Sequence, residues 1–208
     1  MDLALLASLF RGDNKNMTAI SVGAETSFEA YLAMDEGAEP RLELFRGRVF
    51  EMMSASGTHV VVQANLARMC GTALRGKPCR FVGENAKVHV PRKGSGYHPD
   101  GTIACPLRFS NEAQGVVENP QVVFEILSPG TERFDRTDKW DDYATIESVR
   151  EIVLIETEAA RVEIYERRED GWLKRVYLAG TAARVPSIGL ELALDELYED
   201  ATPAPIPS

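Results

Sequence analysis

The chain has 208 residues, 44% of them hydrophobic, and a formal net charge of −9 at pH 7. This length fits one domain better than two, and no apolar run approaches the ~20 residues that a membrane span requires. The acidic balance argues against a protein that coats nucleic acid by non-specific attraction. It does not exclude a nuclease, because a bound metal ion offsets carboxylates locally.

The three cysteines, Cys70, Cys79 and Cys105, are odd in number and have no spacing typical of a metal site. The simplest explanation is a reducing compartment, where disulfides are rare. We therefore expect a cytoplasmic protein.

Residues 1–26 are expected to be an N-terminal extension to a domain that spans residues 27–200. Apolar residues that begin at Leu3 are compatible with a short amphipathic helix, but no basic segment precedes them, which argues against a signal peptide. Met17 is an alternative start of the chain. An ordered helix that is swapped between the subunits of a dimer is a second interpretation of the extension.

The first predicted element of the domain is a surface helix that begins after Ser27, a good N-cap, and ends near Gly37. Arg41–Phe45 and Arg48–Met53 then predict the two strands of a hairpin. Glu43 alternates with apolar neighbours, and we expect it to be an exposed strand acid rather than a third metal ligand.

The longest helical pattern runs over Gly57–Arg75, where apolar residues recur at helical spacing. His59, at the polar start of this helix, is interpreted either as a contact to a substrate phosphate or as a surface or capping residue. Cys79–Val90 predicts one or two strands with a break at Gly83–Asn85.

A basic segment follows this helix. It contains one acid, Glu84, and six basic residues, Arg75, Lys77, Arg80, Lys87, Arg92 and Lys93. Two interpretations remain open, contact with phosphates and a sheet edge protected by lysines. The segment leads through Gly94–Gly96, expected to be a flexible turn, to Asp100.

The two acids Asp100 and Glu125 are candidates for a metal site. Pro99 and Asp100 stand at the start of an apolar strand, and Glu125 interrupts Val122–Leu127, a run typical of a strand buried on both faces. A carboxylate in such a strand is costly unless it is paired or bound to a metal ion. Positions 100 and 125 are 25 residues apart, which leaves room for two strands and a loop. Carboxylates on adjacent strands, ~4.8 Å apart, can share one divalent cation.

A cation follows the second acid within one loop and one helical turn. Asp135 is expected to cap a helix on which Lys139 and Tyr143, four residues apart, share a face. Two interpretations remain open at this point, a functional site and a buried structural salt bridge between Glu125 and Lys139.

The rest of the domain is expected to consist of strands and connections: a polar connection at Asn111–Asn119, a buried strand at Glu151–Glu156, a hairpin of Arg161–Arg167 and Trp172–Leu178, and a short terminal element at Leu190–Leu197. Residues 201–208, which contain three prolines, are expected to form a disordered tail.

Several of these segments follow one another in a characteristic order: Pro99–Asp100, the sequence Val-Phe-Glu-Ile-Leu-Ser-Pro-Gly-Thr around Glu125, and then Asp135, Lys139 and Tyr143. This ordered set resembles the Uma2 family of endonucleases, which belongs to the PD-(D/E)xK, or restriction-endonuclease-like, superfamily. The likeness extends from about Phe28 to about Tyr198, with further similar segments at Glu43–Glu51 and Glu151–Ile155.

The resemblance implies an α/β fold of the restriction-endonuclease-like type, with a mixed central sheet flanked by helices on both faces. It also implies a metal-dependent endonuclease that hydrolyses DNA phosphodiester bonds, and a homodimer. Asp100, Glu125 and the backbone carbonyl of Ile126 would bind Mg²⁺ or Mn²⁺, and Asp100, Glu125 and Lys139 would be the catalytic residues. Lys139 would orient the attacking water or neutralise the developing charge. Tyr143 is a candidate for a hydrogen bond to Lys139 or Glu125.

Two positions depart from the family pattern. The superfamily lysine stands two residues after the second acid, where this chain has Leu127, and the resemblance suggests that Lys139 replaces it. Gly101 stands where the family more often has a β-branched residue, which weakens the strand. The alternatives to a DNA endonuclease are a catalytically silent module of the same fold, which binds protein or nucleic acid, and a nuclease that acts on RNA.

Overall fold

The computed structural model of the chain describes residues 25–52 and 54–201. The predictions made for residues 1–24 and for the tail after residue 201 lie outside the described residues. The helices are α2 (Phe28–Asp35), α3 (Gly57–Ala73), α4 (Glu132–Phe134), α5 (Trp140–Tyr143) and α6 (Leu194–Leu197), with short 3-10 or π-helical segments η1 (Pro91–Lys93), η2 (Asp135–Lys139) and η3 (Pro186–Ile188). The strands are β1 (Leu42–Phe45), β2 (Arg48–Glu51), β3 (Arg80–Gly83), β4 (Lys87–Val90), β5 (Ser95–Tyr97), β6 (Gly101–Ala104), β7 (Phe109–Asn111), β8 (Val116–Val117), β9 (Val122–Leu127), β10 (Glu151–Glu156), β11 (Arg161–Arg168), β12 (Gly171–Leu178), β13 (Ala182–Val185) and β14 (Leu190–Ala193).

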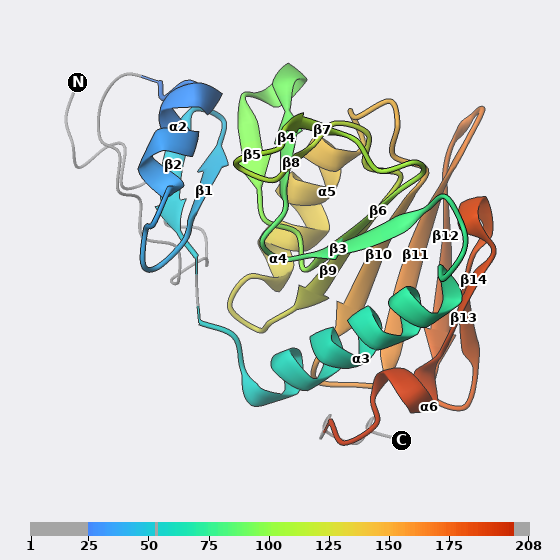
Figure 1. Cartoon of the computed structure of the whole chain (residues 1–208). Helices are drawn as coiled ribbons and strands as arrows, with labels where there is room; N and C mark the ends of the chain where they lie inside the picture. The colour runs from blue at the N-terminus through green and yellow to red at the C-terminus, as the bar shows by residue number, and fades with distance from the viewer. Residues whose placement is uncertain (1–24, 53, 202–208) are drawn as a thin grey trace.

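The central sheet has six strands in the order β12-β11-β10-β9-β6-β3 (Figure 1). β9 and β10 are parallel, whereas their other neighbours are antiparallel, so the sheet is mixed. All six residues of β9 are buried, as its apolar run predicts. Parallel neighbours need a crossover connection, and helical residues 132–143 lie within the one that joins β9 to β10. The predicted α/β class with a mixed central sheet is confirmed.

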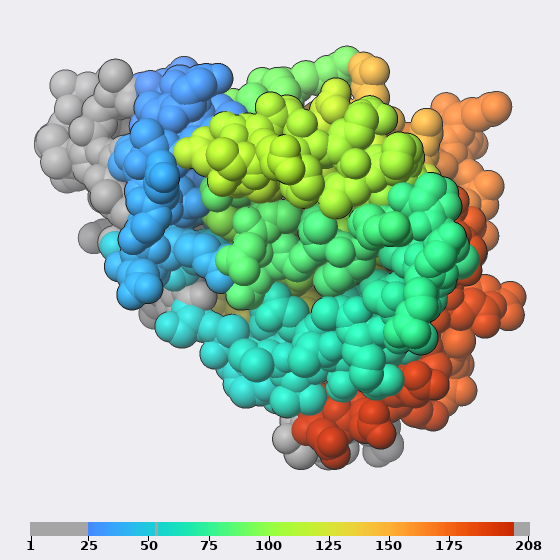
Figure 2. Space-filling model, in the orientation of Figure 1, coloured from blue at the N-terminus to red at the C-terminus, as the bar shows by residue number. Residues whose placement is uncertain are grey.

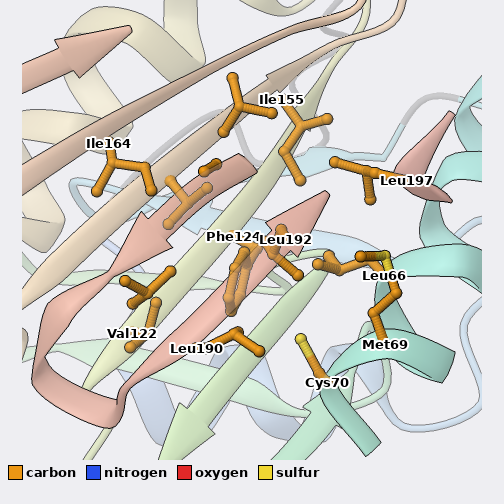
Figure 3. Close-up of a cluster of buried hydrophobic side chains, with 14 of the residues drawn as sticks. Leu66, Met69, Cys70, Val122, Phe124, Ile155, Ile164, Leu190, Leu192 and Leu197 are labelled. Atoms are coloured by element: carbon orange, nitrogen blue, oxygen red, sulfur yellow. The ribbon is translucent and has the colours of Figure 1, made fainter. Parts of the chain in front are cut away.

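Helix α3 covers one face of this sheet. Phe124 and Ile126 of β9 point toward it and share a core cluster with Leu66, Met69 and Cys70 of the helix, several of which are labelled in Figure 3. The short helix α6 lies beside α3, and both reach the surface shown in Figure 2. Loss of a fully buried aromatic ring such as that of Phe124 would cost about 3–5 kcal/mol of stability.

The opposite face of the sheet is covered by the helical crossover α4-η2-α5. Val123 and Leu127, which alternate with the residues that face α3, cluster here with Phe134 and Tyr143. A second six-stranded sheet, in the order β2-β1-β5-β4-β8-β7, contributes to the same cluster, for example through Tyr97. The crossover is therefore buried between the two sheets, and a polar side chain on it is enclosed.

Two connections contain strands that the sequence does not predict. Gly94–Gly96 is not a flexible turn, because residues 95 and 96 belong to the buried strand β5, which pairs with β1 and β4. A Cβ atom on Gly96 would lie 2.6 Å from Cε2 of Phe28, so the glycine allows a ring of α2 to pack on the strand. Asn111–Asn119 includes the two-residue strand β8, which is buried and pairs with β4 and β7.

Gly101, the departure from the family pattern at the start of β6, has a packing explanation. A Cβ atom at this position would lie 2.4 Å from Cε2 of Phe81 on the neighbouring strand β3. The aromatic ring thus fills the space that a side chain at residue 101 would occupy, and it offsets the loss of packing that a glycine causes in a strand.

Cys79 and Cys105 form a disulfide. They flank β3 and β6, where Arg80 lies opposite Ala104, so the antiparallel register brings the two cysteines together. Spacing along the chain does not predict this pair, and disulfides are rare in a reducing compartment. The pairing counts against the inference of a cytoplasmic protein from its cysteines. Cys70 is a free, buried thiol.

Candidate metal and catalytic site

A pocket opens where β1, β6, β9, the N-terminus of α3 and the helical crossover meet. Its titratable lining residues are Glu43, Glu51, His59, Glu84, His98, Asp100, Glu125, Asp135 and Lys139. Ile126 also lines the pocket. The structure thus brings together all the residues for which the sequence predicts catalytic or metal-binding roles.

Asp100, directly before β6, and Glu125, in the neighbouring strand β9, line the same pocket. β6 and β9 are antiparallel, and the register ends with Gly101 opposite Phe124, so Asp100 and Glu125 each follow directly at that end of the strand pair. Glu125 emerges on the face that carries the helical crossover, where it lies beside Lys139, whereas the carboxylate of Asp100 lies at the end of the strand, between α3 and β9.

Two donors fix the carboxylate of Asp100. Nε2 of His59 lies 2.9 Å from Oδ1, and the backbone N–H of Ile126 donates to Oδ2 across 2.6 Å. The first contact comes from helix α3 and the second from β9, so the aspartate is held between two elements of the core. The sequence is compatible with His59 as a phosphate contact or as a surface or capping residue, and neither interpretation includes its contact with Asp100.

Lys139 is enclosed by three carboxylates. Its Nζ lies 2.9 Å from Oε1 of Glu43, 3.4 Å from Oε1 of Glu125 and 3.6 Å from Oδ1 of Asp135. The lysine side chain is only 8% exposed. A π-helical turn over Asp135–Lys139 presents both of its end residues to the pocket, and such turns frequently occur at functional sites.

Two expectations from the sequence are wrong here. Glu43 is not an exposed strand acid, because it is 7% exposed and pairs with Lys139. The two-residue alternation of β1 correctly places Glu43 on the opposite face from Leu42 and Leu44. The helical crossover covers the face of Glu43, so this residue is buried. Asp135 is not an N-cap, since the helical segment begins at Glu132 and Asp135 lies within it, 5% exposed.

The pocket contains more negative than positive charge. Burial raises the pKa of Glu125 well above its usual value; Lys139 opposes this rise, and Asp135, Asp100 and Glu43 add to it. Burial likewise raises the pKa of Asp135, to about 6. Burial would lower the pKa of Lys139, but the surrounding carboxylates outweigh it and hold that pKa well above its usual value. An additional cation would relieve this repulsion.

The donor set fits a hard divalent cation of the Mg²⁺ type. Over residues 25–52 and 54–201, no three histidine, cysteine, aspartate or glutamate side chains already group as a complete metal site. Mg²⁺ does not require one, because it usually keeps several waters and is bound through one or two carboxylates. Asp100, Glu125 and Ile126 line one pocket and meet that requirement, and the excess of buried negative charge favours the ion.

Tyr143 supports Glu125 from the crossover. Its hydroxyl donates to Oε1 of Glu125 across 2.6 Å, so of its two predicted partners it contacts the glutamate. The ring also packs edge-on against Tyr97, 5.3 Å between centroids.

The basic segment after α3 is largely tied into the structure. Lys87 pairs with Asp35 at 3.1 Å, Arg92 with Glu147 at 2.7 Å, and Arg80 donates to the carbonyl of Lys77. These contacts favour a structural role for the three cations over contact with phosphates.

Comparisons with known proteins agree with this architecture. The family model described as "Uma2: Putative restriction endonuclease" matches residues 28–195. An uncharacterised protein of Synechocystis sp., slr1290, is 29% identical over 171 residues, which are 82% of this chain and 90% of that protein. A second uncharacterised Synechocystis protein, sll1609, is 28% identical over 145 residues, 69% of this chain and 82% of that protein.

A solved structure shares the fold. The crystal structure of a protein from Anabaena variabilis, described as a "putative nuclease belonging to DUF820", superposes with a TM-score of 0.64 and 19% sequence identity, over 77% of this chain and 91% of that one. The family match covers the whole of the region that carries Asp100, Glu125 and Lys139. The chain therefore belongs to the Uma2 family of restriction-endonuclease-like proteins.

Proposed function

We propose that this protein is a metal-dependent endonuclease that hydrolyses phosphodiester bonds of DNA. The observation that carries the proposal is that Asp100, directly before β6, and Glu125, in the neighbouring strand β9, line one pocket with Lys139. Membership of the Uma2 family supports nuclease chemistry in general.

Each site residue has a role that follows from its chemistry. The carboxylates of Asp100 and Glu125 and the carbonyl of Ile126 would hold Mg²⁺ or Mn²⁺. When bound, such an ion polarises a phosphoryl oxygen and lowers the pKa of a coordinated water. Lys139 is protonated, so it acts as a hydrogen-bond donor that orients the attacking water or stabilises negative charge on the phosphate. Tyr143 keeps Glu125 in place.

A catalytically silent module of the same fold, which binds protein or nucleic acid, is the second candidate. It is favoured by the contacts of Lys139 with Glu43 and Glu125, which form a buried ion-pair cluster that needs no substrate. Buried ion pairs are costly to desolvate and also occur for structural reasons. The two candidates differ in whether the acids bind a metal ion.

Thermal melting with and without Mn²⁺, combined with a plasmid-nicking assay, separates the two candidates. The endonuclease predicts that Mn²⁺ raises the Tm of the wild type and that Asp100→Asn and Glu125→Gln lose both this shift and nicking. In the silent module Mn²⁺ shifts no Tm and the wild type does not nick. The change in stability of Glu125→Gln without metal is less informative, because Lys139 keeps its contact with Glu43.

The substrate and the assembly belong to the same proposal. We place DNA before RNA as the substrate, and we propose a homodimer, because a duplex has two strands to cut. No described helix is both long enough and apolar enough to cross a membrane. The cytoplasmic location stays a prediction from the sequence, against which the disulfide between Cys79 and Cys105 counts.

A further inference from the structure

We propose that His59 is a positioning residue for Asp100 and that it sets the affinity of the pocket for the divalent cation. The inference deepens the proposed function and rests on it. It gives His59, at the N-terminus of α3, a role in the site. Neither the family match nor the sequence motifs include this role.

The contact between the two side chains is specific. Nε2 of His59 lies 2.9 Å from Oδ1 of Asp100, and the side chains are 12% and 14% exposed. An ionised carboxylate only accepts hydrogen bonds, so Nε2 carries the hydrogen in this contact. A charge-assisted bond of this kind, largely shielded from water, is among the stronger hydrogen bonds of a protein.

The other ring nitrogen does not face a substrate. Nδ1 of His59 is buried, and among the described residues it has no hydrogen-bond partner. With Nε2 engaged by Asp100 and Nδ1 buried, neither nitrogen is presented to a ligand in the pocket. His59 therefore acts on the reaction through Asp100 and not by direct contact with a phosphate.

The first turns of helix α3 hold this histidine in a fixed position. The N-cap Ser56 accepts a hydrogen bond from the backbone N–H of His59 at 3.2 Å, which fixes the first turn. One turn later, Gln63 donates to Glu84 at 3.0 Å and reaches the carbonyl of Asp100 at 3.5 Å. The first two turns of α3 thus hold both the side chain and the backbone of Asp100.

The arrangement leaves room for a cation. Each carboxylate oxygen of Asp100 accepts one hydrogen bond, Oδ1 from His59 and Oδ2 from the backbone of Ile126, and each oxygen has a second lone pair. Loss of a group that orients a metal ligand typically weakens metal binding by about 10–100-fold. Without His59, the carboxylate of Asp100 would keep only the hydrogen bond from the backbone of Ile126 and would sample more orientations in the pocket.

The test is Mn²⁺ affinity, measured by isothermal titration calorimetry on the full-length protein. We expect His59→Ala to bind Mn²⁺ about 10–100-fold more weakly than the wild type. His59→Gln, whose amide can still donate to Asp100, should recover part of the affinity. Nicking by His59→Ala should recover at saturating Mn²⁺, because Asp100 itself is intact. If His59→Ala proves unstable in urea, His59→Leu replaces it, since leucine keeps the apolar bulk of the ring.

A matched control is His89→Gln. His89 stacks on Phe28, with 3.7 Å between ring centroids, and does not line the pocket, so its Mn²⁺ affinity should equal that of the wild type. Equal affinity of His59→Ala and the wild type would overturn the role of His59 and leave the endonuclease standing. A wild type that binds no Mn²⁺ would overturn both.

Discussion

Tyr143 donates its hydroxyl hydrogen to Oε1 of Glu125 across 2.6 Å, and the two residues are 0% and 4% exposed. Burial and the nearby charges of Glu125 and Glu43 raise the pKa of Tyr143 well above its usual value, so the phenol stays protonated and remains a donor. The same oxygen of Glu125 lies 3.4 Å from Nζ of Lys139. One carboxylate oxygen is thus directed toward the helical crossover.

Replacing Tyr143 by Phe should destabilise the protein, because it leaves a buried carboxylate oxygen without its hydroxyl donor. We expect a loss of about 1–3 kcal/mol in the free energy of unfolding, measured by urea denaturation. Tyr165→Phe is the matched control. The Tyr165 hydroxyl lies 3.2 Å from Glu163, which keeps stronger partners, so this change should cost less. Equal costs for the two variants would contradict the importance of the Tyr143 contact.

Glu163 gives a pH-dependent contribution to stability that is independent of the pocket. Burial alone would raise its pKa, but the hydrogen bond from Lys174 and the charges of Arg136 and Arg161 outweigh this and hold the pKa below 4.5. An acid whose pKa is lower in the folded state stabilises the fold above its unfolded pKa. That contribution is lost as the pH falls.

Glu163→Gln should therefore be less stable than the wild type by about 1–3 kcal/mol at neutral pH. The difference should shrink as the pH falls below 4.5, the ordinary value for this group. Urea denaturation of both proteins at neutral pH and at about pH 3.5 measures it. A difference that stays constant over this interval would show that the ion pairs of Glu163 are not its cause.

The elements with strong local patterns could be predicted from the sequence. The run Val122–Leu127 predicts a buried strand, and the spacing over Gly57–Arg75 predicts helix α3. β5 could not be predicted, because Ser95 and Gly96 suit a turn. They form a strand because distant segments pair with it, β1 and β4, and because the rings of α2 pack against that glycine.

The site could be predicted in part for a similar reason. Asp100 and Glu125 stand out because acids beside or within buried strands need partners. Glu43 and His59 do not stand out, since their environment comes from distant segments. The two-residue period of β1 predicts only that Glu43 faces away from the apolar residues. Lys139, 96 positions later in the chain, lies against that face and buries Glu43.

Assembly is the prediction that depends least on the pocket. If the protein cuts both strands of a duplex as a homodimer, light scattering at ~10–50 µM, well above a typical specific Kd, should give twice the mass of the 208-residue chain. A monomer mass at this concentration would refute the dimer. It would leave open an enzyme that nicks one strand at a time.

Lys139 provides the sharpest test of what the acidic pocket is for. Lys139→Met removes the cation that lies within 4 Å of Glu43, Glu125 and Asp135. It leaves these carboxylates buried without that counter-charge, and we expect a loss of about 3–5 kcal/mol near neutral pH. Nicking should be lost as well. Lys174→Met is the control, because Lys174 is 43% exposed and its partner Glu163 keeps two arginines, so the cost should be ~1 kcal/mol or less.

Addition of Mn²⁺ to Lys139→Met then distinguishes the two candidate functions. In an endonuclease, Asp100 and Glu125 still hold the divalent cation, and its charge offsets the repulsion that the variant has exposed. The increase in unfolding free energy on adding Mn²⁺ should therefore be larger in Lys139→Met than in the wild type. In a silent module the acids serve only to bind the lysine, so the variant would stay destabilised at every Mn²⁺ concentration. Because metal binding is measured here through the free energy of unfolding, the experiment distinguishes the two candidates even though Lys139→Met is inactive under both.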